Sequence, residues 1–253
     1  MGAGTVPQFA RQAGGVRRTA FITALAAEAR TLRPAFASGA DPAAANAVHI
    51  AVAGIGAAAA GKAAVVAMQG GADALVSWGF AGGLAPRLSC GTLVVAERIV
   101  CANGRVFATD DEWRAALFGC ISARQIACCA PLLSVSAVLA DAACKAQQFQ
   151  NSGAVAVDME SAAVAQVARD WHVPFVAVRA VVDTASDRLP RSIADAIDGA
   201  GKLRWGRLCT ALARAPRDVP SLLGLGSRYR IARRALRTAA LAGRDHLHLA
   251  VAM

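Results

Sequence analysis

The sequence predicts an α/β fold: a single three-layer domain in which helices flank a central mixed, largely parallel sheet. The chain has 253 residues, enough for one domain with a substantial core. Short apolar runs alternate with helical patterns along it, which is typical of α/β proteins. Most of these runs lack the polar alternation of a half-exposed strand, and therefore indicate a sheet that is covered on both faces.

The expected elements follow one another in a regular order. Residues 20–25 form the first expected strand, and residues 28–36 form the helix after it. A strand over 48–52 ends in Gly54-Ile55-Gly56, and an Ala-rich helix follows to about Met68. The other expected strands span residues 74–78, 92–96, 132–135, 154–157 and 175–182, with a helix over 160–171 between the last two.

Composition excludes several classes of protein. No uncharged apolar stretch reaches the ~18 residues that a membrane-spanning helix needs. The seven cysteines contain no C-x-x-C pair, so we expect neither a metal site nor a disulfide framework. Residues 1–18 are basic and lack the apolar segment of a secretory signal, so we interpret them as a tail and expect a cytoplasmic protein.

Positive charge is concentrated at the end of the chain. From Gly201 onward there are eleven basic and two acidic residues, whereas the preceding part is nearly balanced. We therefore divide the chain into the tail, a main domain over 19–200 and a basic helical extension over 201–253. Within the extension, residues 227–241 resemble a basic amphipathic helix. Such a helix can rest on the anionic inner face of a membrane, or it can be a solvated surface helix or a subunit contact. Aromatic residues are few there, so we expect no nucleic-acid binding.

Two acidic clusters each follow an apolar run. Asp158 and Glu160 come after the run at 154–157, and Asp183 ends the run at 175–182. Open α/β sheets bind ligands at the carboxyl ends of their strands, where a partly desolvated carboxyl group can hold a proton or bind a hydroxyl group. Helix capping is the alternative interpretation of each cluster. Two such clusters in succession favour a site.

These segments also resemble a known family. The residues that carry the resemblance are Gly79-Phe80-Ala81-Gly82-Gly83-Leu84-Ala85-Pro86, Gly91-Thr92-Leu93-Val94-Val95, Val157-Asp158-Met159-Glu160, Val173-Pro174-Phe175 and Arg179-Ala180-Val181-Val182-Asp183. Together they resemble the nucleoside phosphorylase and nucleosidase superfamily, with the closest general likeness to methylthioadenosine/adenosylhomocysteine nucleosidase. Within the superfamily the chain looks most like the hopanoid-associated phosphorylase branch. The resemblance makes 19–200 the catalytic domain and implies adenosylhopane as the substrate, an adenine nucleoside with a large apolar 5′ substituent.

The resemblance also implies roles for individual residues. Asp183 matches the acid that protonates N7 of adenine, so that the base leaves as a neutral molecule. Glu160 matches the residue that binds the ribose hydroxyls, and Met159 the residue that packs against the sugar. Glu28 matches the glutamate that activates water in the nucleosidases, although from the sequence alone it is equally well a helix N-terminal acid.

The glycine-rich turn contributes Gly79, Phe80 and Ala81 to the expected substrate site, since glycines let the backbone approach a ligand closely. Two departures from the family pattern concern this site. No arginine for phosphate stands in or before the turn, and Val182 replaces the serine that often hydrogen-bonds the catalytic aspartate.

The reaction needs no cofactor, only water or inorganic phosphate as co-substrate, and we slightly favour water. We expect a homo-oligomer, in the first instance a dimer. Methylthioadenosine or adenosylhomocysteine cleavage is the alternative activity. A non-catalytic nucleoside- or lipid-binding module is the alternative of another class, and the intact Glu28, Glu160 and Asp183 argue against it.

Overall fold

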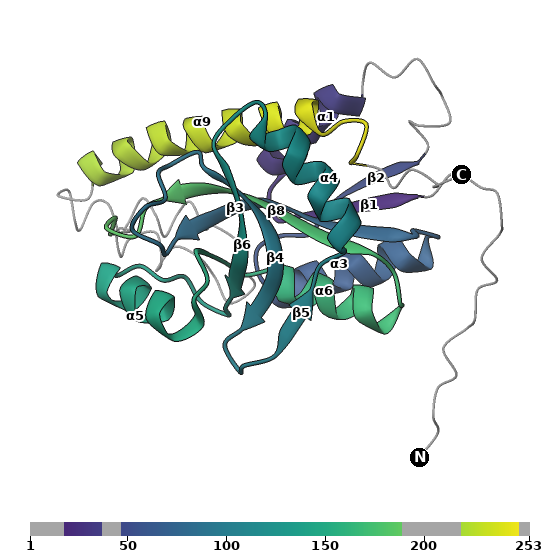
Figure 1. Ribbon diagram of the computed structural model, residues 1–253, viewed down its shortest axis with the longest axis horizontal. Coiled ribbons are helices and arrows are strands. Elements are labelled where there is room, and N and C mark those ends of the chain that lie inside the picture. The colour runs from purple at the N-terminus through teal and green to yellow at the C-terminus, as the bar shows by residue number, and fades with distance from the viewer. Residues whose placement is uncertain (1–17, 37–46, 189–218, 248–253) are drawn as a thin grey trace.

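Helices cover both faces of one mixed sheet (Figure 1). The structure is a computed structural model that describes residues 18–36, 47–188 and 219–247. Its strands are β1 (Thr19–Thr23), β2 (Val48–Val52), β3 (Ala74–Gly83), β4 (Leu93–Cys101), β5 (Val106–Ala108), β6 (Ala127–Ser134), β7 (Ala156–Asp158) and β8 (Phe175–Asp183). Its helices are α1 (Ala26–Phe36), α3 (Ala57–Gln69), α4 (Asp111–Ser122), α5 (Ala142–Ser152), α6 (Ser161–Asp170) and α9 (Val219–Ala242).

The sheet runs in the order β2-β1-β3-β7-β6-β4-β5, and β8 pairs with both β3 and β4. The pairings from β3 through β8, β4, β6 and β7 lead back to β3, so these five strands form a closed ring. Five of the eight described pairings are parallel and three are antiparallel. The predicted mixed, largely parallel sheet is therefore confirmed.

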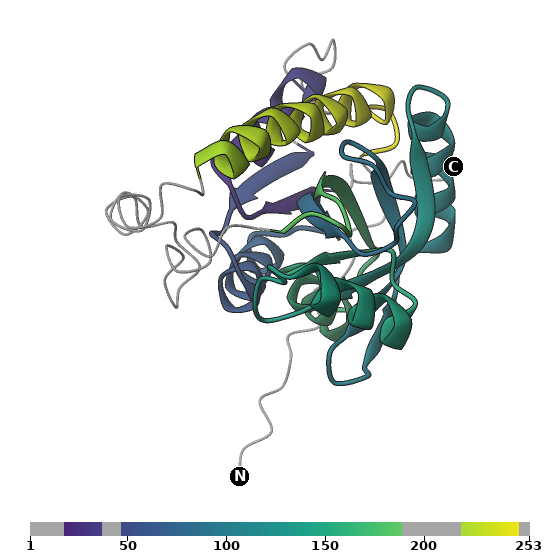
Figure 2. The same cartoon turned by 90° about the vertical axis from the view of Figure 1, so that its left-hand side faces the viewer.

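Two apolar layers hold the helices to the sheet. On one face α3 and α6 pack on Leu75, Ala177 and Val181. On the other, α1, α4 and α9 pack on Trp78 and Val178. Figure 2 shows α9 lying across its face of the sheet, with α3, α5 and α6 on the far side. The three-layer prediction is confirmed, and the covered faces explain why the strands carry nearly continuous apolar runs.

Helix α9 belongs to this packing. Its inward face buries Ala232, Leu236, Ala239 and Ala240 completely, and it lies against α1 and β8. The helix begins at Val219, one residue before Pro220. It continues through Gly224-Leu225-Gly226, where the glycines of the sequence indicate an interruption, so that expectation is wrong. Pro220 stands in the first turn, where its missing N–H has no helical partner to lose. The predicted boundary at residue 200 lies outside the described residues.

Other helices and strands were not foreseen from the sequence, among them α4, α5 and the short strand β5. The strand expected over 132–135 is the second half of the longer β6. In the described part of the chain, none of the helices combines the length and apolar character that a membrane crossing requires.

Candidate active site

A gap in the strand pairing creates the first part of the site. Strand β1 pairs with β3 only as far as Ser77, whereas β3 continues to Gly83. Beyond Ser77, the edge of β3 would have unpaired backbone groups, which are costly when buried. The side chain of Glu28, from the first turn of α1, fills this position: its Oε1 accepts the N–H of Phe80 at 2.9 Å.

Three backbone N–H groups hold the buried carboxylate of Glu28. Besides Phe80, Ala24 and Leu25 each donate to its Oε2 at 2.8 Å. Burial raises the pKa of Glu28, while Arg179 and these N–H groups oppose the rise. Glu28 therefore caps the start of α1, as one interpretation of the sequence had it, and also reaches across to the glycine-rich turn. A held carboxylate with a raised pKa is suited to accept a proton near neutral pH.

Arg179, on β8, lies at the centre of the acidic groups. Its Nε and Nη2 both donate to Oδ2 of Asp158, at 2.8 and 2.6 Å, and Nη2 also donates to Ser77 at 2.7 Å. The same Nη2 lies 4.0 Å from Oε2 of Glu160. Burial alone would lower the pKa of Arg179, but Asp158, Glu160 and Glu28 raise it. The guanidinium group is thus a fixed buried cation that offsets part of the repulsion among the carboxylates.

The two acids of the first cluster have different roles. Asp158 accepts the N–H of Ser161 at 3.1 Å and pairs with Arg179, so it is a structural acid at the start of α6. Glu160 makes no capping hydrogen bond. Its Oε1 instead accepts the N–H of Gly56, which lies 104 positions earlier, at 2.8 Å. Burial, with Asp158 next, raises the pKa of Glu160 to about 7.

The strand-helix turn at Gly54 and Gly56 also positions Glu160. Both glycines have φ of +99°, a conformation that other residues adopt only with strain. This backbone directs the N–H of Gly56 toward the carboxylate.

Gly79 is required by the close approach of Glu28 and Arg179. A Cβ atom there would lie 2.7 Å from Nη1 of Arg179 and closer still to Oε1 of Glu28. We predict that Gly79→Ala displaces the Glu28 carboxylate, lowers the free energy of unfolding by about 1–3 kcal/mol, and reduces activity. Denaturant unfolding and a turnover assay measure both effects.

Gly119→Ala is the matched control for this substitution. Gly119 lies within α4, and a Cβ added there meets no atom within 4 Å. That substitution should be neutral or stabilising, by about 0.5–1 kcal/mol. Equal behaviour of the two variants would mean that Gly79 is not constrained by the site.

Asp183 ends β8 and pairs with a buried lysine that the sequence analysis missed. Lys145 is the one buried residue of the described helix α5, and its side chain forms an ion pair with Asp183. Its Nζ also donates to the carbonyl oxygens of Thr184 and Asp187, at 2.8 and 3.0 Å. Lys145 therefore supplies the partner that Val182 cannot be. Burial raises the pKa of Asp183, and Lys145 opposes the rise.

An aromatic pair borders the Glu28 side of the site. Phe80 contacts Tyr229 of α9, with ring centroids 5.0 Å apart. Burial raises the pKa of Tyr229, and the charge of Glu28 raises it further. One residue before Tyr229, Arg228 pairs with Asp187 at 2.8 Å. Helix α9 thus connects both parts of the site.

The structure brings Glu28, Glu160, Gly79 and Phe80 together around Arg179. Asp183 lies farther along β8, four residues after Arg179 and beyond a shift in the pairing of β8 with β3. Met159 precedes Glu160 and donates its N–H to that carboxylate at 3.3 Å, while Ala81 is buried in the core below. The sequence did contain a signal for a functional role of Arg179, because it is a charged residue inside an apolar run. Lys145 and Tyr229 had none.

Comparison with known proteins identifies the family and similar folds. A family model described as Phosphorylase superfamily matches residues 38–204. The fold is similar to that of 5′-methylthioadenosine/S-adenosylhomocysteine nucleosidase from Neisseria meningitidis, with a TM-score of 0.64 at 21% identity, covering 89% of this chain and 98% of that one. Futalosine hydrolase of Helicobacter pylori gives a TM-score of 0.63 at 16% identity, covering 88% of this chain and 97% of the other.

A third similar structure is the nucleosidase from Colwellia psychrerythraea in complex with adenine, at a TM-score of 0.61 and 21% identity. The match covers 79% of this chain and 96% of that one. At these identities the likeness shows the fold, whereas the family match extends over more than half of the sequence. The chain therefore belongs to the phosphorylase superfamily of enzymes.

Proposed function

We propose that this enzyme cleaves the N-glycosidic bond of adenosylhopane, with water as the nucleophile, and releases adenine. The observation that supports cleavage is the presence of two kinds of buried carboxyl group, one at the end of β8 and two beside Arg179. Asp183 is a buried carboxyl group with a raised pKa, and Glu28 and Glu160 are held by backbone N–H groups beside Arg179. This reaction needs three groups: an acid that protonates adenine, a carboxylate that binds the sugar hydroxyls, and a general base that activates water.

The charges around Glu28 support water over phosphate. Burial and Asp158 raise the pKa of Glu160 most, and the charge of Glu28 raises it further. The nearby cation, Arg179, is already engaged by Asp158 and Ser77. A phosphate dianion placed between two carboxylates would be repelled in this low-dielectric site, whereas a water molecule can donate to either of them.

The surroundings of Asp183 support its assignment as the acid that protonates adenine. A departing adenine anion is too basic to leave easily at neutral pH, so a proton must reach the base as the bond breaks. Burial favours the protonated carboxyl group, and the hydrogen bond that Lys145 donates to Oδ2 fixes its orientation. As the bond breaks, the proton of Asp183 passes to N7, and the positive charge that develops on the sugar faces Glu160 and Glu28.

The choice of adenosylhopane depends on the resemblance to the hopanoid-associated branch and on the apolar border of the site. Phe80 and Tyr229 present ring surfaces next to Glu28. Such a border suits a large apolar 5′ substituent. Methylthioadenosine is the second candidate, because similar folds include nucleosidases for that compound.

Adenine release tests the proposal. The purified enzyme is incubated with adenosylhopane or methylthioadenosine, with and without phosphate, and the products are separated by chromatography. We predict release of adenine together with a free sugar in phosphate-free buffer, faster from adenosylhopane, and a large loss of this hydrolysis in Glu28→Gln. Strict dependence on phosphate would overturn water as the nucleophile. Failure to release adenine from either nucleoside would overturn the function.

A further inference from the structure

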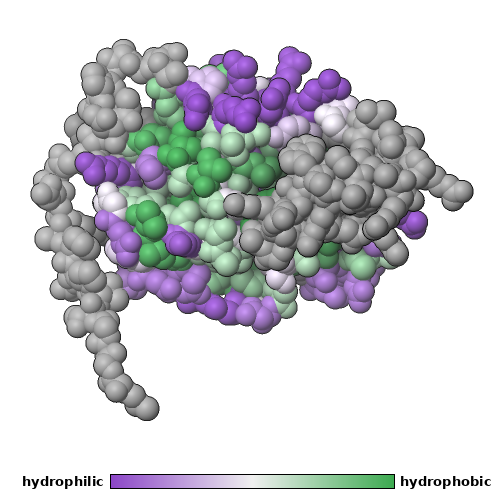
Figure 3. Space-filling view, turned by 180° about the vertical axis from the view of Figure 1, so that it is seen from behind, coloured by the Kyte–Doolittle hydropathy of each residue, from purple (hydrophilic) through white to green (hydrophobic). Residues whose placement is uncertain are grey.

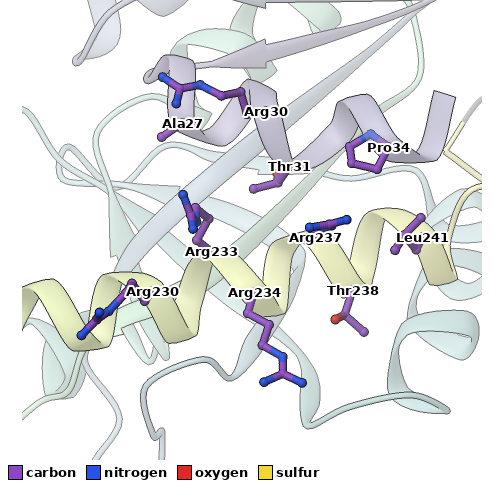
Figure 4. A pocket seen from close by; sticks show the side chains of 10 residues that line it. All are labelled: Ala27, Arg30, Thr31, Pro34, Arg230, Arg233, Arg234, Arg237, Thr238 and Leu241. Carbon is purple, nitrogen blue, oxygen red and sulfur yellow. The ribbon is translucent and has the colours of Figure 1, made fainter. Parts of the chain in front are cut away.

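An open cleft of about 660 Å³ lies between α1 and α9. Half of the residues that line it are arginines (Figure 4). They are Arg30 from α1 and Arg230, Arg233, Arg234 and Arg237 from α9. No Asp or Glu is among its described lining residues.

The arginines of α9 form one face of the helix. Their spacing of three, one and three residues places them along a single stripe. The opposite face is the one that buries Ala232, Leu236 and Ala239 against the sheet. Packing therefore holds the stripe outward, and all four side chains are exposed. In Figure 4, Arg233 and Arg237 project into the space between the two helices.

In the part of the chain that the structure describes, these guanidinium groups have no acidic partner: none of the five forms an ion pair with a carboxylate. Arg228, by contrast, lies off the stripe and pairs with Asp187. Five cations in one cleft repel one another, and an external anion would relieve that repulsion.

Apolar side chains accompany this charge. Leu241 continues the stripe one turn beyond Arg237 and is 48% exposed, and Ile231 at its flank is 51% exposed. From behind, hydrophilic side chains gather along the upper edge of the molecule, where Figure 1 places α1 and α9 (Figure 3). A cationic helix face that also exposes Leu and Ile is typical of helices that lie in the headgroup region of a membrane.

We propose that the α1–α9 cleft and the arginine stripe dock on a membrane surface by binding anionic phospholipid headgroups. Arg230 and Arg237 are about 10 Å apart along the helix, a length over which several headgroups can be engaged at once. A single free phosphate could contact only part of the stripe and would leave Leu241 in water. Docking in this way brings the Phe80–Tyr229 border near the membrane surface, because Tyr229 lies on the same helix as the stripe.

Co-sedimentation with vesicles tests this proposal without any need for enzymatic activity. The full chain is mixed with phosphatidylcholine vesicles that contain or lack phosphatidylglycerol, at an ionic strength of about 0.1 M, where the Debye length is about 10 Å. We expect binding only to the anionic vesicles and loss of binding at about 1 M salt. Because each arginine at such a surface contributes a factor of about five, Arg234→Gln/Arg237→Gln should weaken partitioning about thirtyfold.

The control removes two positive charges outside the cleft. Lys62 on α3 and Arg124 after α4 are both exposed, and Lys62→Gln/Arg124→Gln should bind within about threefold of the wild type. The proposal is overturned if anionic vesicles do not bind, or if both double variants lose binding equally. It is also overturned if pyrophosphate or a short RNA competes with the vesicles at concentrations too low to act through ionic strength. That result would assign the cleft to a free polyanion or to a nucleic acid.

Discussion

Asp183→Asn is expected to lower kcat for adenine release by about 10²–10⁴-fold, the range typical of a lost general acid. Asparagine can still accept a hydrogen bond from Lys145 and can donate one to N7, but it cannot transfer a proton. The ion pair is replaced by a hydrogen bond from the charged lysine to the amide oxygen, and the bonds of Lys145 to the carbonyl oxygens of Thr184 and Asp187 continue to solvate its charge. The variant should therefore fold and bind nucleoside. Steady-state kinetics with a thermal unfolding scan separate the two effects.

Asp187→Asn is the matched control, because the two carboxyl groups differ in the direction of their pKa shift. Burial raises the pKa of Asp183. At Asp187 burial acts in the same direction, but the bonds from Thr184 and the charge of Arg228 outweigh it and lower the pKa. A carboxylate held ionised in this way cannot act as an acid near neutral pH. A loss of kcat in Asp187→Asn as large as in Asp183→Asn would contradict the assignment.

Lys145→Met should have the largest effect on stability, because it leaves a buried carboxyl group without its cation. Removal of one partner of a buried ion pair costs about 3–5 kcal/mol. We expect the low end of that range, since Asp183 can take up a proton in the variant. The activity should also fall, because a misplacement of about 1 Å in a reacting group can cost about a hundredfold in rate. Denaturant unfolding and kcat measure these losses.

Two further results distinguish positioning of Asp183 by Lys145 from a purely structural role. Lys145 lowers the pKa of Asp183, so its removal should let the acid keep its proton to higher pH and should move the alkaline limb of the rate profile upward. In an Asp183→Asn background, Lys145→Met should cost much less stability, because no unpaired carboxylate remains. Lys145 would be a structural residue only if Lys145→Met left the pH profile unchanged and cost the same stability with Asp183 as with Asn at position 183.

The layered sheet could be predicted because apolar runs and helical patterns are local signals. The antiparallel pairings of β7 and β8 could not, because they depend on how strands distant in the sequence close the ring. The same distinction applies to the site. Glu28, Glu160 and Gly79 stand in recognisable segments, and the structure brings them together around Arg179.

Lys145 shows where prediction from sequence ends. It lies in a polar helix, Ala142–Ser152, in which a lysine is an ordinary surface residue. Its burial follows only from the packing of α5 against the end of β8, where Asp183 and two carbonyl oxygens accept from it. The absence of a serine at Val182 indicated that Asp183 needed another partner, but nothing local identified which residue it was.

The most direct test of the central claim, that a proton from Asp183 makes adenine a leaving group, uses a nucleoside whose N7 is replaced by carbon. Such a 7-deaza analogue retains the sugar and most of the base, but it offers no atom for that proton. We predict that the enzyme binds the analogue as a competitive inhibitor and releases no 7-deazaadenine, while it cleaves the matching adenine nucleoside. Cleavage of the two nucleosides at comparable rates would contradict the role of Asp183.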